Sequence, residues 1–473
     1  MRFRVALLAG KLVNFLCRFF RYSGTSLPGG VALKICPQLI YKMAPAYDQV
    51  VAVTGTNGKT ITANLIAHIL RSSGLSVANN YEGANMIAGV ATALIKDCTL
   101  NGRARSQVAV LEVDEGSVKK VFPAVQPDLV IVTNYFRDQL DRFCELDHNI
   151  TLLRRVMTDL PSTRILLNAD DPLVVAAGRD HSAVSYYGVD GKQSEDKTGD
   201  YDIREGKFCP DCGNSLHYHY YHYGQLGDYY CPGCTFRRPV PDFLACDIKV
   251  DDSPLDFTLT VRRWNSSSEG CSAADTVRLR AYIRGFYNVY NILAASSAAV
   301  ILGVSEKAIQ ASLLDFAPAT GRMEGFIYRG RPCTLALVKN PTGLNEVLKT
   351  ILRKEGEKAL IIAINDLAAD GRDVSWLWDA GFEMLDNQSI NKVICSGRRA
   401  GDVAVRLKYA GVPLSKLILE PGCRESLETL GLQGAEEYYV LVSYTSLNKY
   451  AKLLQKMGKD VVRGADQGMP SLS

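Results

Sequence analysis

The chain has 473 residues, enough for two or three domains, and 47% of them are apolar, which is ample for buried cores. The formal net charge is only +4, so charge gives no support to nucleic-acid binding as the main activity. Thirteen cysteines in a chain of intracellular character point to metal ligands or free thiols rather than to a disulfide framework.

The N-terminal segment, residues 1–45, is basic and amphipathic. Residues 2–21 interleave basic side chains with leucines and phenylalanines, so no uncharged run approaches the ~20 apolar residues of a membrane span. The uncharged runs are also too short for the core of a signal peptide, and we expect a cytoplasmic protein. Two interpretations of the segment remain open. It forms either a helix lying on the inner face of the plasma membrane or a helix packed on the first domain with its arginines reaching solvent.

The most informative motif follows an apolar run at residues 50–53. It reads Thr54, Gly55, Thr56, Asn57, Gly58, Lys59 and Thr60, and a helical pattern runs on to about Ser73. This order of strand, glycine loop and helix predicts a phosphate-binding loop, in which backbone N–H groups and Lys59 bind phosphates and the Thr60 hydroxyl binds Mg²⁺. Val53 stands where the usual spacing has a glycine. The alternative is a glycine turn beside a surface lysine.

Further apolar runs at residues 108–111, 129–132 and 165–167 are separated by segments of helical length. This alternation predicts an α/β fold with a mainly parallel sheet and helices on both faces. Ligands bind such sheets at the carboxyl ends of the strands, where Glu112 follows the first of these runs. We therefore expect Glu112 and Thr60 to bind Mg²⁺ together, although a helix cap or loop residue is the alternative for Glu112.

Four cysteines form two closely spaced pairs. The ligand candidates are Cys209, Cys212, Cys231 and Cys234, with two residues inside each pair and eighteen between the pairs. This spacing predicts a structural Zn²⁺ held by four thiolates in a ribbon inserted at about residues 203–240, with a redox pair as the rival for either half alone. We expect His217, His219 and His222, which lie between the pairs, to be strand and surface residues rather than ligands. The other nine cysteines are interpreted as small apolar residues.

The C-terminal part has strand-like runs at residues 360–364, 392–395, 417–419 and 438–442. They predict a second, smaller α/β domain over about residues 325–458, after a nucleotide-binding domain over residues 46–324. The tail at residues 459–473 is expected to be disordered.

Taken in chain order, several segments resemble the ATP-site motifs of Mur ligases. The segments are Gly55–Thr60, Glu82–Asn85, Glu112, Thr133–Asn134, Asn168–Pro172, Asn288–Asn291 and Gly321–Glu324. The resemblance implies a ligase that phosphorylates a carboxylate with ATP and lets an amine displace the phosphate. It also implies that Asn288 and Asn291 lie near the adenine and Arg322 near the phosphates. Helix capping or packing is the alternative for the two asparagines.

Two segments depart from the Mur ligases that add amino acids. Residues 138–141 replace a histidine segment of those enzymes, and Val338–Pro341 replaces another. These departures, the four-cysteine insertion and residues 365–379 resemble instead the MurT family, the Mur ligase-like subunits of lipid II isoglutaminyl synthase. That resemblance implies ATP- and Mg²⁺-dependent amidation, in peptidoglycan biosynthesis, of the α-carboxylate of D-glutamate in the lipid II stem peptide to D-isoglutamine. It also implies a heterodimer with a GatD-like glutaminase that supplies ammonia.

A glutaminase requires a nucleophilic cysteine with a histidine partner. His222 is the last histidine in the chain, so Cys333, Cys395 and Cys423 in the C-terminal half have none near in sequence. Hydrolysis of glutamine is therefore expected from another polypeptide.

The MurT resemblance implies that an aspartate of residues 366–379 completes the glutaminase site across the interface. We expect Asp373 to orient the partner's catalytic histidine, with Asp370 and Asp366 as second choices and capping of a helix or turn as the alternative for all three. Trp376 and Trp378 are candidate interface anchors, with core packing favoured for at least one of them.

Two alternative functions remain open. One is a Mur-like ligase that adds an amino acid, which would need a pocket for that amino acid's carboxylate and no glutaminase. The other is a P-loop ATPase that binds nucleic acid through its zinc ribbon. Arg237 and Arg238 are the only basic cluster beside the ribbon, and no nucleic acid partner is expected.

Overall fold

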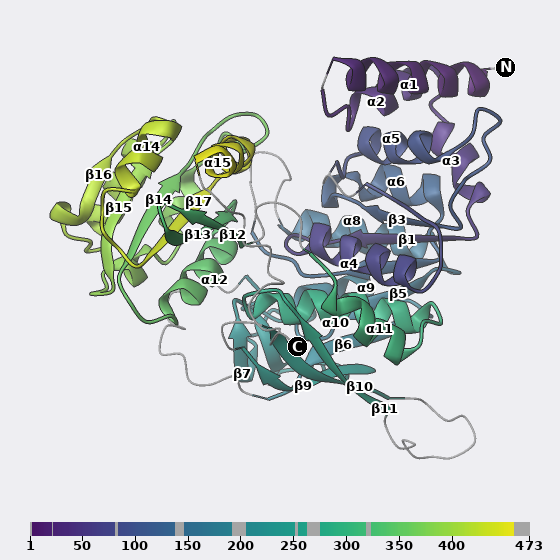
Figure 1. Ribbon diagram of the computed structural model, residues 1–473. Coiled ribbons are helices and arrows are strands. Elements are labelled where there is room, and N and C mark those ends of the chain that lie inside the picture. Colours follow the sequence, from purple (N-terminus) through teal and green to yellow (C-terminus); the bar gives the residue numbers. More distant parts are fainter. Residues whose placement is uncertain are drawn as a thin grey trace, which may run out of the picture.

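The protein is described by a computed structural model over residues 2–20, 22–80, 84–137, 146–191, 205–250, 254–262, 275–317 and 323–457. Two large sheets, each with helices on both faces, lie side by side, and a small hairpin packs under the first (Figure 1). Several predicted features lie outside the described residues: Glu82, residues 138–141, Arg322 and the tail from 459. None of the helices in the described ranges combines the length and apolar content that crossing a membrane requires.

The first sheet has nine strands in the order β11-β10-β9-β6-β5-β4-β1-β3-β2. The strands are β1 (Gln49–Thr54), β2 (Val77–Asn79), β3 (Val108–Glu112), β4 (Leu129–Val132), β5 (Arg164–Asn168), β6 (Val184–Val189), β9 (Phe243–Lys249), β10 (Leu255–Val261) and β11 (Asp275–Ala281). From β2 through β9 the neighbouring strands pair in parallel, and β10 and β11 continue the sheet antiparallel. The predicted mainly parallel sheet is therefore confirmed.

Alternate residues of the central strand enter two different cores. Val51 and Val53 pack with helices on one face, whereas Val50 and Ala52 pack with helices on the other. The helices of the first face are α4 (Lys59–Ser72), α10 (Tyr287–Ile301) and α11 (Glu306–Leu314). Those of the second are α5 (Ile87–Asp97), α6 (Val118–Val125), α8 (Leu146–Thr158) and α9 (Pro172–Gly178). Both faces of the sheet are thus buried, which explains its continuous apolar strands.

Three N-terminal helices add an outer layer on the second face. They are α1 (Arg2–Phe19), α2 (Leu27–Ile35) and α3 (Leu39–Met43). In α1, Gly10 permits close packing, since a Cβ at Gly10 would lie 2.9 Å from Cδ1 of Ile95 on α5. The N-terminal helix therefore packs on the first sheet's domain, which agrees with one of the two interpretations of this segment.

The second sheet has six strands in the order β12-β13-β17-β14-β15-β16. They are β12 (Glu324–Tyr328), β13 (Arg331–Leu337), β14 (Lys358–Ala363), β15 (Ile390–Ser396), β16 (Leu417–Leu419) and β17 (Glu437–Val442). All pairs are parallel except β12 with β13. Helices α12 (Pro341–Leu352) and α13 (Ala400–Tyr409) cover one face, and α14 (Cys423–Leu430) and α15 (Tyr444–Met457) cover the other. The four strand-like runs predicted in this part are all strands.

Candidate active site

The predicted phosphate-binding loop connects β1 to the first turn of α4. Gly55 has φ +120° and Gly58 has φ +84°, conformations that side chains with a Cβ rarely adopt. A Cβ at Gly58 would also collide with the side chain of Asn291 on α10. Both glycines are therefore needed for the shape of this loop, and the strand–loop–helix order is as the sequence predicts.

The end of β4 holds the loop in place. The N–H of Asn57 donates to Oδ1 of Asn134 at 2.9 Å, and the Thr133 hydroxyl donates to the carbonyl of Asn57 at 2.8 Å. The N–H of Thr56 donates to the carbonyl of Asn134 at 2.7 Å. These bonds pre-shape the loop before any nucleotide binds, and they give Thr133–Asn134 a structural role in the site.

Lys59 is buried at the start of α4, with 6% of its side chain exposed. Its ammonium donates to Oε2 of Glu115 at 2.9 Å, to the carbonyl of Thr56 at 3.1 Å and to the carbonyl of Gly55. Burial lowers the pKa of Lys59, but the Glu115, Asp114 and Glu112 carboxylates outweigh it and leave the pKa above its ordinary value. Lys59 is therefore a fixed cation, already paired with Glu115.

Glu112 at the end of β3 has a free oxygen atom at the site. Its Oε1 accepts from Nδ2 of Asn85 at 2.9 Å, whereas its Oε2 is buried with no hydrogen-bond partner among the described residues. Thr60 lines the same cavity as Glu112. An unpartnered buried carboxylate oxygen and a hydroxyl that line one cavity are a donor set that suits Mg²⁺, so the residues present fit the predicted ion.

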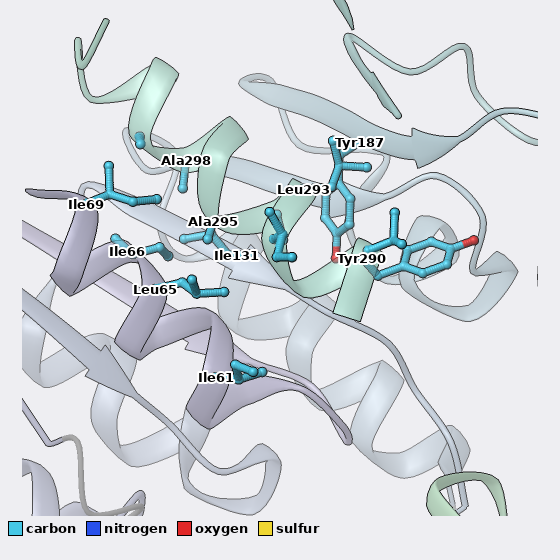
Figure 2. Packing of buried hydrophobic residues seen from close by; sticks show 14 of the residues in the cluster. Ile61, Leu65, Ile66, Ile69, Ile131, Tyr187, Tyr290, Leu293, Ala295 and Ala298 are labelled. Atoms are coloured by element: carbon cyan, nitrogen blue, oxygen red, sulfur yellow. The ribbon is translucent and has the colours of Figure 1, made fainter. Parts of the chain in front are cut away.

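Helices α4 and α10 pack side by side on the first sheet (Figure 2). Ile61, Leu65 and Ile69 of α4 face Leu293, Ala295 and Ala298 of α10, as Figure 2 shows. The packing brings the first turns of the two helices together at the loop.

The two asparagines of α10 belong to this junction. Asn291 accepts from the Thr62 hydroxyl at 3.4 Å and donates to Oδ1 of Asn288 at 2.8 Å, and Asn288 donates to the carbonyl of Arg284 at 2.6 Å. Both are buried, and both line the cavity above the loop. Packing between α4 and α10, which was the alternative for these two asparagines, is thus part of their role. Their position beside the loop also agrees with the expectation that they lie near a bound nucleotide.

The second sheet reaches the same loop through residues that follow β13. Nδ2 of Asn340 donates to Oδ1 of Asn57 at 2.9 Å, and the Lys339 ammonium donates to the carbonyl of Thr56 at 3.3 Å. Asn340 also caps α12 by accepting from the N–H of Gly343 at 2.8 Å. The sequence pattern treats Val338–Pro341 only as a departure from other ligases and misses this contact. A lysine and an asparagine directly after a strand were the available signal.

A single cavity of about 700 Å³ lies where the two sheets meet. From the first sheet it is lined by the loop, Glu112, Asp114 and the two asparagines of α10. From the second it is lined by Lys339, Asn340, Glu346, Asp370 and Trp376, among others. Burial and the Glu115 carboxylate raise the pKa of Asp114. The cavity therefore combines a phosphate-binding end with a mixed acidic and basic wall.

The three candidate aspartates of the C-terminal part have different surroundings. Asp373 is half-buried and accepts from the N–H of Ser375 at 2.8 Å and from its hydroxyl at 3.0 Å, bonds that lower the pKa of Asp373. Asp370 is 7% exposed and accepts from the Thr445 N–H at 2.7 Å, at the start of α15. Asp366 forms ion pairs with Arg398 at 2.8 Å and Arg399 at 2.9 Å. Only Asp370 lines the cavity.

The two candidate tryptophans also differ in their surroundings. Trp376 packs against the core of the second sheet and lines the cavity, whereas Trp378 is 56% exposed. The Trp378 ring lies 5.8 Å from the Tyr409 ring and 5.7 Å from the Arg406 guanidinium. Core packing therefore applies to Trp376, and Trp378 presents an aromatic surface.

The four paired cysteines come together in space. Their sulfur atoms all lie within 4.8 Å of one another, with 3.5 Å between Cys209 and Cys234 and 3.4 Å between Cys212 and Cys231. Burial raises the pKa of the Cys231 thiol, but the Gly233 N–H and the neighbouring thiols offset this and lower it to about 7. A closed set of four thiols, one of them readily ionised, fits a structural Zn²⁺.

A hairpin of β7 (His217–Tyr223) and β8 (Leu226–Tyr230) joins the two cysteine pairs. The segment after the second cysteine pair docks on the first domain through Arg238, whose Nε donates to Oδ1 of the buried Asp170 at 2.6 Å. His217 and His219 are exposed strand residues as predicted, but the His222 side chain is fully buried beside Asp170, which corrects the surface expectation for His222. Burial lowers the pKa of His222. Docking of the hairpin explains this burial.

Two family models match the chain. The Mur ligase middle domain matches residues 53–218, and the MurT ligase C-terminal domain matches residues 337–447. Solved structures with the same fold include a pseudomurein peptide ligase type C from Methanothermus fervidus, with a TM-score of 0.66 and 23% identity, covering 86% of this chain and 78% of that one. MurF from Acinetobacter baumannii has a TM-score of 0.63 and 18% identity, covering 92% of this chain and 81% of that one.

Curated relatives match over almost the whole chain. One, from Staphylococcus aureus strain COL, is 34% identical over 464 residues, which is 98% of this chain and 100% of the relative. Another, from Streptococcus pneumoniae, is 33% identical over 95% of this chain and 96% of its own length. Both are named lipid II isoglutaminyl synthase (glutamine-hydrolyzing) subunit MurT. The chain therefore belongs to the MurT family of Mur ligase-like subunits.

Proposed function

We propose that the chain is the ligase subunit that amidates the α-carboxylate of D-glutamate in the lipid II stem peptide to D-isoglutamine. The names of its full-length relatives support this reaction. The observation that carries it is the single cavity in which the phosphate-binding loop meets Lys339 and Asn340 from the second sheet. One cavity with a phosphate end and an acceptor end suits formation and use of an acyl-phosphate.

The phosphate end would bind ATP. The loop N–H groups and Lys59 would hold the phosphates, Asn288 and Asn291 would lie near the adenine, and Arg322 would lie near the phosphates by family likeness. Thr60 and Glu112 would hold Mg²⁺, which when bound offsets negative charge on the transferring phosphoryl group. When ATP binds, the Lys59 ammonium would release the Glu115 carboxylate and pair with a phosphate group instead.

The acceptor end would activate and amidate the carboxylate. Phosphorylation turns a poor leaving group into a good one, and Lys339 lies where it can offset charge on the acyl-phosphate. Ammonia then attacks the acyl carbon and phosphate leaves. Ammonium is not nucleophilic, so ammonia has to be delivered without protonation by bulk water.

We propose that a GatD-like glutaminase subunit supplies the ammonia. The relatives are named as subunits of a glutamine-hydrolysing enzyme, and this chain has no histidine after His222. Burial raises the pKa of Cys395 to about 12 and that of Cys423 to about 11, and it also raises the pKa of Cys333, which is the opposite of an activated nucleophile.

Asp373 is our choice for the residue that orients the partner's histidine. It is half-buried and ionised, whereas Asp370 is buried against α15 and Asp366 is paired with two arginines. The exposed Trp378 near Asp373 in sequence supports a partner surface on this side of the second sheet.

The domain boundaries and the metal complete the proposal. We propose a nucleotide-binding domain over residues 46–324 with a structural Zn²⁺ ribbon inserted at about residues 203–240, and a C-terminal domain over residues 325–458. The two separate sheets and the four-cysteine cluster support this division. The reaction would take place at the inner face of the plasma membrane, where a lipid-linked acceptor is found.

The test is a mass measurement on the product. The purified chain is incubated with ATP, Mg²⁺, detergent-solubilised lipid II and ammonium chloride at alkaline pH, with and without a co-expressed glutaminase. We expect the mass change from a carboxylic acid to an amide, and use of glutamine only with the partner. Addition of a whole amino acid would instead establish the amino-acid-adding alternative, and ATP use independent of lipid II would contradict both.

A further inference from the structure

Helix α1 has two apolar faces. One packs on α2 and α5 and buries Ala6, Leu7, Gly10 and Cys17. The opposite face, which we call the outer stripe, consists of Val5, Leu8, Leu12, Phe15, Leu16 and Phe19. These side chains are between 42% and 71% exposed, and their spacing of three and four residues places them on one side of the helix. Six large apolar side chains in one exposed row indicate a binding surface.

Positive charge gathers around the outer stripe. Residues 1–47 contain seven lysines and arginines and not one aspartate or glutamate. The whole chain has a net charge of only +4, so the remainder of the chain is net negative. Arg2, Arg4 and Arg18 on α1 are exposed. The stripe therefore lies within a basic segment without acidic residues, in an otherwise slightly acidic sequence.

The segment after α1 leads to the active-site cavity. Ser23, Thr25 and Ser26 line that cavity, and so does Met86, which is 54% exposed. Leu27, the first residue of α2, is 59% exposed. In Figure 1, α1 forms the outermost layer of the first domain, above α2 and α5. The segment that follows α1 thus connects the helix directly to the wall of the cavity.

We propose that the outer stripe docks α1 flat on a membrane surface rich in anionic phospholipid. The apolar side chains would enter the boundary between headgroups and acyl chains, and the arginines would bind lipid phosphates. A second copy of α1 is disfavoured as occupant, because two equally basic surfaces repel each other. Resting on the proposed function, this docking would let the headgroup of a lipid-linked substrate reach the cavity while its lipid stays in the bilayer.

Vesicle flotation of the full chain tests the proposal. We expect the protein to float with vesicles of phosphatidylglycerol and phosphatidylcholine, less at high salt, and not with phosphatidylcholine alone. The variant Leu12→Ser/Phe15→Ser/Phe19→Ser should bind about tenfold more weakly or worse, since it removes three large apolar groups from the contact. Arg2→Gln/Arg4→Gln/Arg18→Gln should lose the preference for anionic lipid.

The matched control changes three equally exposed leucines of the second sheet's domain, Leu414→Ser/Leu419→Ser/Leu432→Ser. It should bind vesicles as the unaltered chain does. Equal flotation of the stripe variant and the control would overturn the proposal. A second result would also overturn it: the unaltered chain does not bind vesicles but forms a dimer in solution, and the stripe variant is a monomer. The stripe would then be covered by a second copy of the chain.

The enzyme assay separates this proposal from the proposed function. With detergent-solubilised lipid II the stripe variant should amidate at the unaltered rate, and with lipid II in anionic vesicles it should be slower. Vesicle binding without amidation in detergent would reject the proposed reaction and leave the docking intact. Amidation in detergent without vesicle binding would reject the docking alone.

Discussion

At the scale of single residues, the site is defined by charges buried at close range. Lys59 lies between the loop carbonyls and Glu115, and Asp114 and Glu112 are near enough to raise the pKa of Lys59. In the free protein these carboxylates neutralise a cation that ATP would otherwise find unpaired. Binding of the ATP phosphates therefore competes with the ion pair between Lys59 and Glu115. The Asp114 and Glu112 carboxylates also attract Lys59 and so set the strength of that competition.

Removal of Lys59 should separate catalysis from stability. Lys59→Ala is expected to abolish ATP turnover and to cost about 3 kcal/mol in free energy of unfolding, because it leaves Glu115 buried without its partner. The double variant Lys59→Met/Glu115→Gln should recover most of that stability and none of the turnover. Thermal unfolding and product analysis measure the two effects. Ligase activity in either variant would refute the assignment of Lys59.

Asp373 offers a second test at this scale. Asp373→Asn should remove glutamine-driven amidation and spare amidation with ammonium salts, because only the partner's histidine would lose its carboxylate. Asp366→Asn, which breaks surface ion pairs with Arg398 and Arg399, is the matched control and should spare both reactions. The measurement is the amidation rate of each variant with glutamine and, in parallel, with an ammonium salt. An equal loss with both sources would place Asp373 in the ligase site or the core.

Asp171 should give the stability a pH dependence. Burial raises the pKa of Asp171 to about 7, against donors that lower it, among them the N–H groups of Tyr135 and Leu173. The folded state therefore binds the proton more tightly than the unfolded state. This contribution to stability is complete below the ordinary pKa of an aspartate and is lost as the pH rises through about 7, with a slope of at most about 1.4 kcal/mol per pH unit.

The variant Asp171→Asn tests whether Asp171 makes the free energy of unfolding fall as the pH rises. It should be less stable overall, since an amide nitrogen cannot accept from these donors, and should lack that part of the slope between pH 5 and pH 7. Denaturant unfolding of the unaltered chain and of Asp171→Asn at several pH values measures both effects. A slope unchanged by the substitution would assign the pH dependence to other groups.

At the scale of elements, the ribbon shows how little of its stability comes from its own core. The ribbon packs Leu216, Tyr229 and Phe236 around Cys209 and Cys231, a small cluster that also includes Val175 and Ala176 of α9. Such a small cluster buries little apolar surface, so a metal ion held by the four thiols would add much of the stability of the ribbon. The contact between Arg238 and Asp170 then fixes the ribbon to the first sheet.

Loss of one ligand should release the metal. We expect one zinc ion per chain in the unaltered protein, and in Cys212→Ser we expect a lower zinc content and a lower melting temperature. Cys246→Ser on β9 is the matched control, because Cys246 lies outside the cluster and should leave the metal content unchanged. Atomic absorption and thermal unfolding measure the two. Unchanged zinc in Cys212→Ser would reject the four-thiolate site.

At the scale of the whole molecule, polar contacts at the loop and an ion pair join the domains of the two sheets. Asn340 binds Asn57 and also caps α12, and Arg137 pairs with Asp379 at 3.3 Å. A nucleotide bound in the shared cavity would touch both sides. The position of the second sheet is therefore expected to depend on the occupancy of the first, as is usual for domains joined by a small interface.

Two substitutions of Asn340 separate its two bonds. Asn340→Ser keeps a side-chain cap for α12, but its side chain is one atom shorter and lacks the Nδ2 that donates to Asn57, so stability should change little while affinity for ATP falls. Asn340→Ala loses both bonds, and its free energy of unfolding should fall by about a further 1 kcal/mol. Calorimetric titration with ATP and thermal unfolding separate the effects. Unchanged ATP affinity in both variants would show that the bond to Asn57 does not shape the nucleotide site.

Much of the fold could be predicted because its signals are local. The glycines and lysine of residues 54–60, the cysteine pairs and the apolar runs of β3, β4 and β14 each depend on neighbours in the sequence, and all lie in the predicted elements. The pairing of Lys59 with Glu115 was not predicted, although Lys59 lies in the recognised loop and Glu115 follows the candidate Glu112 by three residues. The burial of His222 was predicted wrongly, since a tyrosine-rich stretch does not say which side chain docks on Asp170.

The sequence by itself determined the glycine loop after β1 and the four-thiol cluster, because each requires particular residue types at fixed short spacings, and it also carried the ligase-like order of motifs. Only the tertiary structure decided which distant residues share one cavity. Lys339 and Asn340 reach the loop across some 280 residues because β13 ends beside it, and α1 exposes one apolar face because α2 and α5 cover the other. Such contacts depend on how sheets and helices pack, and sequence spacing does not encode that packing.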